Sequence, residues 1–252
     1  MAAEDDLVVA FELHSPKRIA EALQAGARPT TPIRGKRPIE ILIEMYLRSD
    51  RFAECLQVML DAGARLDDRV LEALLLDDSA ALGRLLVSEP EVLQRRFDVN
   101  GAYTSLRNVS ALHVCAEFNS VNCARTLLDA GIFVDVRAET DRDGLGGQTP
   151  LFHTVNSNQN YCRPTMELLA NAGADLDVRI KGLVWGGGFE WETIVFDVTP
   201  ISYAQCGLYA QFHRREQDVY SNIAFLYARR YGSEPPVRNV PNKYLQPRPK
   251  DQ

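Results

Sequence analysis

The chain has 252 residues, of which 46% are hydrophobic and 25% charged, and its formal net charge is −6. This composition is typical of a soluble globular protein, and the acidic balance argues against a general nucleic-acid binder, which normally carries a basic face. No apolar run reaches the roughly 18 to 20 residues that span a bilayer, and the start MAAEDDLVV is acidic where a secretory signal would be basic. Five scattered cysteines do not form the pattern of a disulfide framework, so a reducing, cytoplasmic environment is expected.

Four segments spread along the chain share one design. Each has an apolar helical end, then Ala-Gly or Gly-Ala, then a short stretch that ends in charge. They are EALQAGARP, VMLDAGARLDD, TLLDAGIFVDVR and ELLANAGADLDVR, with their glycines at Gly26, Gly63, Gly131 and Gly173. Such a glycine adopts the left-handed conformation that ends a helix without a Cβ clash. A helix is therefore predicted to end before each of them.

A second motif recurs where helices are expected to begin. It reads RPIE at 37–40, SALH at 110–113, TPLF at 149–152 and TPIS at 199–202. Thr or Ser accepts hydrogen bonds from the free amides of a first turn, and proline there gives up no bond. Apolar residues at helical spacing between the two motifs predict helix–turn–helix units. Between them, VLEALLLDDSAALGRLLVSEPEVL has neither motif but contains two helix-like apolar stretches, which indicates one degenerate unit.

These motifs resemble the ankyrin repeat, with its Thr-Pro-Leu-His opening and Leu-Leu-x-x-Gly-Ala close. The best copy is SALHVCAEFNSVNCARTLLDAG, and about six units at the ~33-residue ankyrin period cover residues 1–232. The resemblance implies an all-α solenoid, and it places His113 where the family histidine ties neighbouring turns together. It also implies a non-enzymatic scaffold that binds another protein. The approximate units are 4–35, 36–67, 68–108, 109–147, 148–197 and 198–232.

The join before the last unit is about 14 residues longer than the ankyrin period allows. Its arms, VRIKGLVW and FEWETIVF, are β-branched and aromatic, and three glycines lie between them. This pattern predicts a β-hairpin finger at about 178–196 with the glycines at its tip. Along the second arm, Phe189, Trp191, Thr193 and Val195 are expected to share one face. The preceding join, with AETDRDGLGG at 138–147, is expected to form a shorter polar loop beside the finger.

Both tryptophans of the chain lie in this finger, and two interpretations stay open. They anchor a partner protein, because interfaces are enriched in Trp and Tyr, or they pack against the core or a neighbouring loop. One tryptophan can also serve in each role. The predicted contact surface is the finger tip together with the concave helices near it. Its residues are Trp185, Phe189, Glu190, Trp191, Glu192, His153 and Tyr203.

Sequence motifs for catalysis, cofactors and metals are incomplete. GLGGQT and WGGGFEW do not complete a phosphate-binding loop, and His113, Cys115 and Cys123 lack the paired spacing of zinc ligands. We therefore predict no catalytic residues, no cofactor, no metal, and no nucleic-acid or membrane partner. One alternative is an enzyme or enzyme-accessory protein with its site near the fifth join, where His153 near Asp143 is the first place to look. Another is a homo-oligomer in which the finger packs on a second copy.

The C-terminal part carries two further predictions. The last unit, with HRREQDVYSNIAFLYARRYG, is expected to cap the solenoid with a polar outer face, although a basic–aromatic patch for an acidic peptide is the alternative. Residues 233–252 form a proline-rich extension, for which extended chain is expected. This extension either lies back along the solenoid or serves as a ligand for something else.

Overall fold

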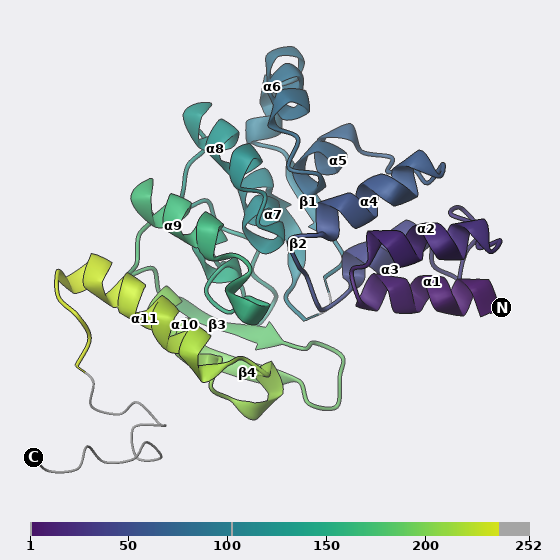
Figure 1. Cartoon of the computed structure of the whole chain (residues 1–252). Coiled ribbons are helices and arrows are strands. Elements are labelled where there is room, and N and C mark those ends of the chain that lie inside the picture. Colours follow the sequence, from purple (N-terminus) through teal and green to yellow (C-terminus); the bar gives the residue numbers. More distant parts are fainter. Residues whose placement is uncertain (1, 102, 237–252) are drawn as a thin grey trace, which may run out of the picture.

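The computed structural model describes residues 2–101 and 103–236, so the predicted extension lies outside the described residues from 237 onward. Six pairs of helical segments follow one another along an arc (Figure 1), which confirms the predicted solenoid of about six units. The α-helices are α1 (Ala2–Glu12), α2 (Pro16–Gln24), α3 (Pro38–Glu44), α4 (Phe52–Asp61), α5 (Arg69–Leu75), α6 (Ser79–Ser88), α7 (Ala111–Phe118), α8 (Val121–Asp129), α9 (Arg163–Asn171), α10 (Pro200–Cys206) and α11 (Glu216–Tyr231). The 3-10 helices are η1 (Pro90–Leu93), η2 (Pro150–His153), η3 (Asn158–Asn160) and η4 (Ala210–Phe212).

The closing glycines end the second helices as predicted. All four have a positive φ, between +88° and +107°. At the first of them the Ala27 amide donates back to the Ala22 carbonyl at 3.0 Å, and this bond satisfies a carbonyl that the helix end leaves free. Corresponding bonds close α4, α8 and α9, so one local motif repeats the same sharp turn along the chain.

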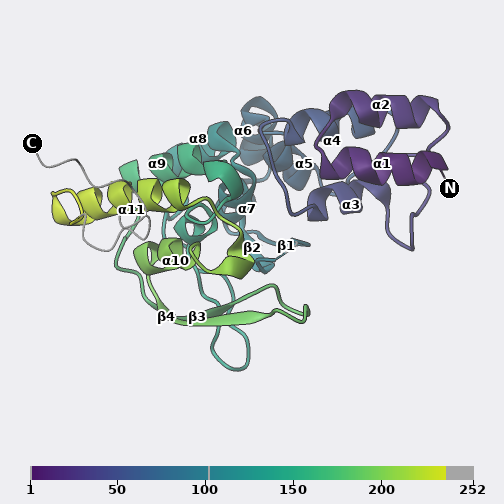
Figure 2. The same cartoon turned by 60° about the horizontal axis from the view of Figure 1, so that its bottom comes forward.

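The helices form two rows, with the β-strands beyond one of them. Figure 2 shows α2, α6, α8, α9 and α11 on one side, α3, α7 and α10 on the other, and β3 and β4 projecting past the latter row. Between the rows runs one continuous apolar core, which extends from Leu7 in α1 to Leu226 in α11. This is the packing expected of repeats that cannot bury their apolar faces alone. No helix within the described residues is both long and apolar enough for a membrane crossing.

Two units depart from the regular pattern. The degenerate third unit forms both predicted helices, and the carboxylates of Asp68 and Asp78 replace the usual cap by accepting backbone N–H bonds at the starts of α5 and α6. In the fifth unit the first helix is reduced to η2. There the Thr154 hydroxyl donates to the Leu151 carbonyl at 2.7 Å, a local bond that competes with continuation of the helix.

The predicted finger is an antiparallel hairpin of β3 (Ile180–Trp185) and β4 (Thr193–Val198), paired from Ile180–Val198 to Trp185–Thr193. The strands thus run slightly past the expected end at 196, and the glycines open the connecting turn. The faces alternate from Ile194 to Phe196, with Val195 buried between two exposed residues, but Asp197 is exposed as well and has a positive φ. Phe189 and Trp191, expected on the face of Val195, lie in the turn before β4.

The polar loop at 138–147 lies beside the hairpin, as expected. The Gly146 amide donates to the Gly182 carbonyl at 2.8 Å, and the Lys181 ammonium donates to the Asp143 carbonyl at 2.6 Å. A second hairpin was not predicted. It consists of β1 (Arg96–Val99) and β2 (Leu106–Ser110), which pair antiparallel ahead of α7.

The N-terminal units contain a buried histidine that makes stability depend on pH. His14 accepts a hydrogen bond from the Ser49 amide at 3.0 Å and packs against the Phe52 ring. Burial, followed by the charges of Arg48 and Arg51, lowers the pKa of His14 to about 4. Because the folded state then binds fewer protons than the unfolded state, this contribution is complete above about pH 6.5 and is lost as pH falls toward 4.

We predict that His14→Asn makes the free energy of unfolding less sensitive to pH. The asparagine oxygen can accept the same Ser49 amide bond, and asparagine tolerates the positive φ of 44° at this position. Between pH 7 and pH 5 the variant should lose roughly 1 to 2 kcal/mol less than the original protein. Urea unfolding at both values measures this, and an identical loss in both proteins would contradict it.

Candidate functional site

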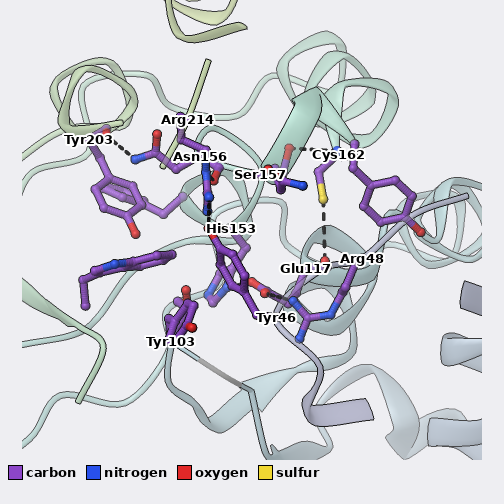
Figure 3. Close-up of a pocket in the computed structure, with 15 residues that line it drawn as sticks. Tyr46, Arg48, Tyr103, Glu117, His153, Asn156, Ser157, Cys162, Tyr203 and Arg214 are labelled. Atoms are coloured by element: carbon purple, nitrogen blue, oxygen red, sulfur yellow. Dashed lines mark hydrogen bonds and ion pairs between the residues drawn. The ribbon is translucent and has the colours of Figure 1, made fainter. Parts of the chain in front are cut away.

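A pocket of about 50 Å³ lies on the side of the solenoid that carries the first helix of each unit. Its lining residues are drawn in Figure 3. Residues from four different units line it. Tyr46 and Arg48 follow α3, Glu117 lies on α7, His153 lies on η2 and Tyr203 lies on α10. Two further parts of its wall come from the hairpin, through Trp185, and from the segment before α11, through Arg214.

A buried charge cluster forms one wall of this pocket. The Arg48 Nη1 donates to Glu117 Oε1 at 2.6 Å, and His153 Nδ1 lies 2.9 Å from Glu117 Oε2. Only 11% of the Arg48 side chain and 12% of the Glu117 side chain are exposed, and the His153 side chain is fully buried. Burial alone raises the pKa of Glu117, but the charge of Arg48 and the bond to His153 outweigh it, so the net shift is downward. Glu117 is therefore held as a carboxylate.

Arg214 forms the opposite wall and connects the last unit with the second. It donates to the Tyr46 hydroxyl and to the backbone carbonyls of Asn156 and Phe212. The Tyr46 hydroxyl also bonds to the Phe212 carbonyl at 3.1 Å, across 166 residues of sequence. The concave side is thus bridged at this point.

The two tryptophans have different surroundings. Trp185 is only 3% exposed, and its ring stacks on Phe212 with centroids 4.4 Å apart. Trp191 is 37% exposed and stacks on Phe189, itself 47% exposed, with centroids 4.9 Å apart. Trp185 is the last residue of β3 and borders the turn, but its ring is packed inward, because Phe212 of η4 covers it.

Glycine and Tyr103 hold the exposed aromatic pair in place. A Cβ on Gly186 would lie 2.1 Å from the Trp191 ring, so glycine is needed for this close approach. Tyr103, from the β1–β2 loop, meets both Phe189 and Trp191 edge-on, at 5.4 and 4.9 Å. The tip is therefore an aromatic cluster supported from the neighbouring hairpin.

The remaining predicted contact residues divide between the tip and the pocket. At the tip, Glu192 accepts a bond from the Gly188 amide at 2.8 Å, which closes the turn, and Glu190 is exposed. In the pocket, Tyr203 is buried. His153 is paired with Glu117, and Asp143, the carboxylate expected near it, lies on the exposed polar loop.

The pocket offers hydrogen-bond donors more readily than nucleophiles. His153 with Glu117 resembles a base with its orienting acid, but His153 Nε2 bonds to no described atom. Burial raises the pKa of the Cys162 thiol to about 12, so this thiol is protonated at neutral pH. Across the described ranges, His, Cys, Asp and Glu form no group of three or more that could hold a metal ion.

The structural role predicted for His113 is confirmed. Its Nδ1 lies 2.8 Å from the Ser110 hydroxyl and its Nε2 lies 3.0 Å from the Gln148 carbonyl in the next unit. The sequence interpretation missed the pocket residues Tyr46, Arg48, Tyr103 and Glu117, and it included Arg214 only in the alternative basic–aromatic patch of the last unit. One signal was present for Tyr103, because Asn100-Gly101 between alternating apolar residues is a hairpin pattern. Tyr46, Arg48 and Glu117 lie in ordinary helical or loop sequence without a motif.

Comparison with known proteins gives the following similarities. The family model described as the ankyrin repeat matches residues 107–141. Among solved structures, the chain is similar to the human ASB11 ankyrin repeat domain, with 19% identity and a TM-score of 0.40, covering 91% of this chain and 83% of that one. It is also similar to EF0377, an ankyrin repeat protein, with 20% identity and a TM-score of 0.36, covering 88% of this chain and 96% of that one. The search of curated proteins finds no match.

Proposed function

We propose that this chain, whose residues 107–141 match the ankyrin repeat model, is a non-enzymatic scaffold that binds a partner protein through its concave side and the tip of the β3–β4 hairpin. Ankyrin repeats generally mediate protein–protein interaction, and nearly the whole described chain is used for stacked repeats. The five cysteines are free, buried thiols, which supports the proposal of a reducing, cytoplasmic environment.

The observation that carries the proposal is the stacked pair of Phe189 and Trp191. Both rings are substantially exposed, yet Tyr103 and Gly186 hold them in one arrangement. A rigid, exposed aromatic cluster loses little side-chain freedom on binding, so it is a favourable interface anchor. Glu190 lies between the two rings in sequence and adds a carboxylate to the contact.

The other proposed contact residues act from behind the tip. Trp185, His153 and Tyr203 form the pocket walls, and Glu192 holds the turn through the Gly188 amide. They position the aromatic pair or receive a group that enters the pocket.

Affinity capture with Phe189→Ala plus Trp191→Ala tests this proposal. If these rings are anchors, proteins captured by the original chain should bind the double variant at least about thirtyfold more weakly, since even one anchor contributes about 2 kcal/mol or more. Phe133→Ala is the matched control, because Phe133 is an exposed aromatic residue (68%) outside the hairpin. The same proteins captured by both variants would refute the role of the tip.

A second candidate is a homo-oligomer formed through β4. In the described chain β4 pairs with β3 alone, and its Ile194 and Phe196 are 42% and 65% exposed. Such a strand edge is a template for pairing with another chain. Sedimentation at several concentrations distinguishes this candidate, and a concentration-independent monomer would eliminate it.

A further inference from the structure

Unsatisfied polar groups are concentrated around the pocket. In the described residues, buried side-chain atoms that bond to no partner belong to seven residues, and four of these line the pocket. Asn156 contributes an oxygen, Oδ1, and the other three contribute nitrogen atoms. They are Arg48 Nε and Nη2, His153 Nε2 and Trp185 Nε1. Buried polar groups are normally hydrogen-bonded, because leaving one unpaired costs about 1 to 3 kcal/mol. A pocket with several of them is suited to a hydrogen-bonding occupant.

The charges around the pocket determine whether that occupant should be positive or negative. Both oxygens of Glu117 are already used, one by Arg48 and the other by His153. Arg214, by contrast, donates to three neutral oxygens, and no described carboxylate forms an ion pair with it. Two guanidinium groups thus face one carboxylate, which leaves one positive charge without a counter-charge.

The size of the pocket limits the occupant to a small group. A water molecule needs roughly 10 to 15 Å³ of such space, so about 50 Å³ accommodates a group of three or four heavy atoms. A carboxylate has this size, carries one negative charge, and accepts bonds from guanidinium and indole N–H groups.

We infer that this pocket receives one carboxylate, supplied by an Asp or Glu side chain of the partner protein. The inference rests on the proposed function and names the chemistry of its partner: an acidic side chain enters the pocket while the neighbouring segment contacts the aromatic tip. Arg214 supplies the uncompensated charge. Trp185 and Arg48 supply neutral and charged donors. His153 Nδ1 already donates to Glu117, so its Nε2 donates to the same group only when both ring nitrogens are protonated.

Titration with acetate, followed by the two indole N–H signals in a ¹⁵N-correlated NMR spectrum, provides the test. The chain has two tryptophans, so Trp191→Phe assigns both signals. At pH 7 and constant ionic strength, acetate should shift the Trp185 signal in a saturable way and leave the exposed Trp191 signal unchanged. Acetamide and chloride should have no such effect. Parallel shifts of both signals, equal shifts with acetamide, or no shift at all, as for a pocket that holds only water, would overturn the inference.

Two variants test the proposed donors. Arg214→Gln should weaken acetate binding at least about tenfold, since it removes the charged partner of the anion. Arg215→Gln is its control, because Arg215 is 65% exposed and paired with Asp218. His153→Asn retains a donor for Glu117 and removes Nε2, so it tests the pocket even if Arg214→Gln does not fold. Unchanged acetate affinity in a folded Arg214→Gln or in His153→Asn would count against the site.

Blocked peptides identify the source of the carboxylate. Acetyl-Gly-Glu-Gly-amide should shift the Trp185 signal at concentrations at least about tenfold lower than acetate, and the Gln peptide should not shift it. Acetate binding with exclusion of the Glu peptide would assign the pocket to a free small carboxylate and overturn the partner's role. A negative result with the Glu peptide does not affect the capture experiment with Phe189→Ala plus Trp191→Ala. The carboxylate pocket and the proposed function can therefore be refuted separately.

Discussion

Replacing Arg48 by methionine should lower the free energy of unfolding by about 3 to 5 kcal/mol, because it leaves the Glu117 carboxylate buried without its main counter-charge. The pair is almost completely shielded from solvent, since only 11% and 12% of the two side chains are exposed. The lost cation also stacks on the Phe118 ring, 4.3 Å from its centroid, which adds to the cost. Urea unfolding measures the change.

A double variant and a surface control separate this effect from lost packing. Arg48→Met combined with Glu117→Gln should recover much of the loss, because a neutral amide needs no counter-charge. Arg37→Met removes the exposed pairs to Glu40 and Asp67 and should cost no more than about 1 kcal/mol. If the Arg48 variant is no less stable than the Arg37 variant, the charge cluster does not stabilise the fold.

The second large effect is expected from Trp185→Ala, at about 3 to 5 kcal/mol. This substitution empties the space between Phe212 and Tyr103, whose ring centroids lie 4.4 and 5.3 Å from that of Trp185. Trp191→Ala should cost about 1 kcal/mol, since that ring is partly exposed and touches mainly the hairpin turn and Tyr103. Thermal or urea unfolding of the two variants compares two tryptophans in one hairpin.

Trp185→Phe refines the comparison. It keeps a ring stacked on Phe212 and should recover a large part of the loss. Equal costs for Trp185→Ala and Trp191→Ala, or the reverse order, would show that η4 does not hold the inner face of the hairpin as the structure indicates. A packed inner face beside an exposed tip is also what the proposed function requires, because the tip can then contact a partner without unfolding.

The third and fifth units show how far local chemistry predicts this fold. Aspartate is a favourable N-cap residue in any helix. Asp68 and Asp78 therefore made the helix pair of the third unit predictable without its usual motif. The fifth unit had the better opening, Thr-Pro, yet its first helix is reduced to η2. Local sequence therefore identifies that a unit is present more reliably than it identifies the length of each helix.

In the β3–β4 hairpin, too, some features follow from the local sequence and others only from tertiary contacts. Its strands and turn follow from β-branched residues flanking glycine, and these signals act over a few residues. Whether Trp185 or Trp191 is buried depends on which face η4 and the β1–β2 loop cover, and those segments are distant in sequence. Sequence alone thus left both roles open for both tryptophans.

By itself, the sequence determined the repeat, the ends of the second helices and the existence of the finger, since each depends on backbone preferences within one unit. Only the tertiary structure decided that Tyr46 meets Arg214, that Arg48 pairs with Glu117, and that Glu117 and His153 face the same cavity. The curvature of the stacked units and the lengths of their insertions set these contacts. No local pattern encodes that curvature, because it accumulates from many small packing interactions between neighbouring units.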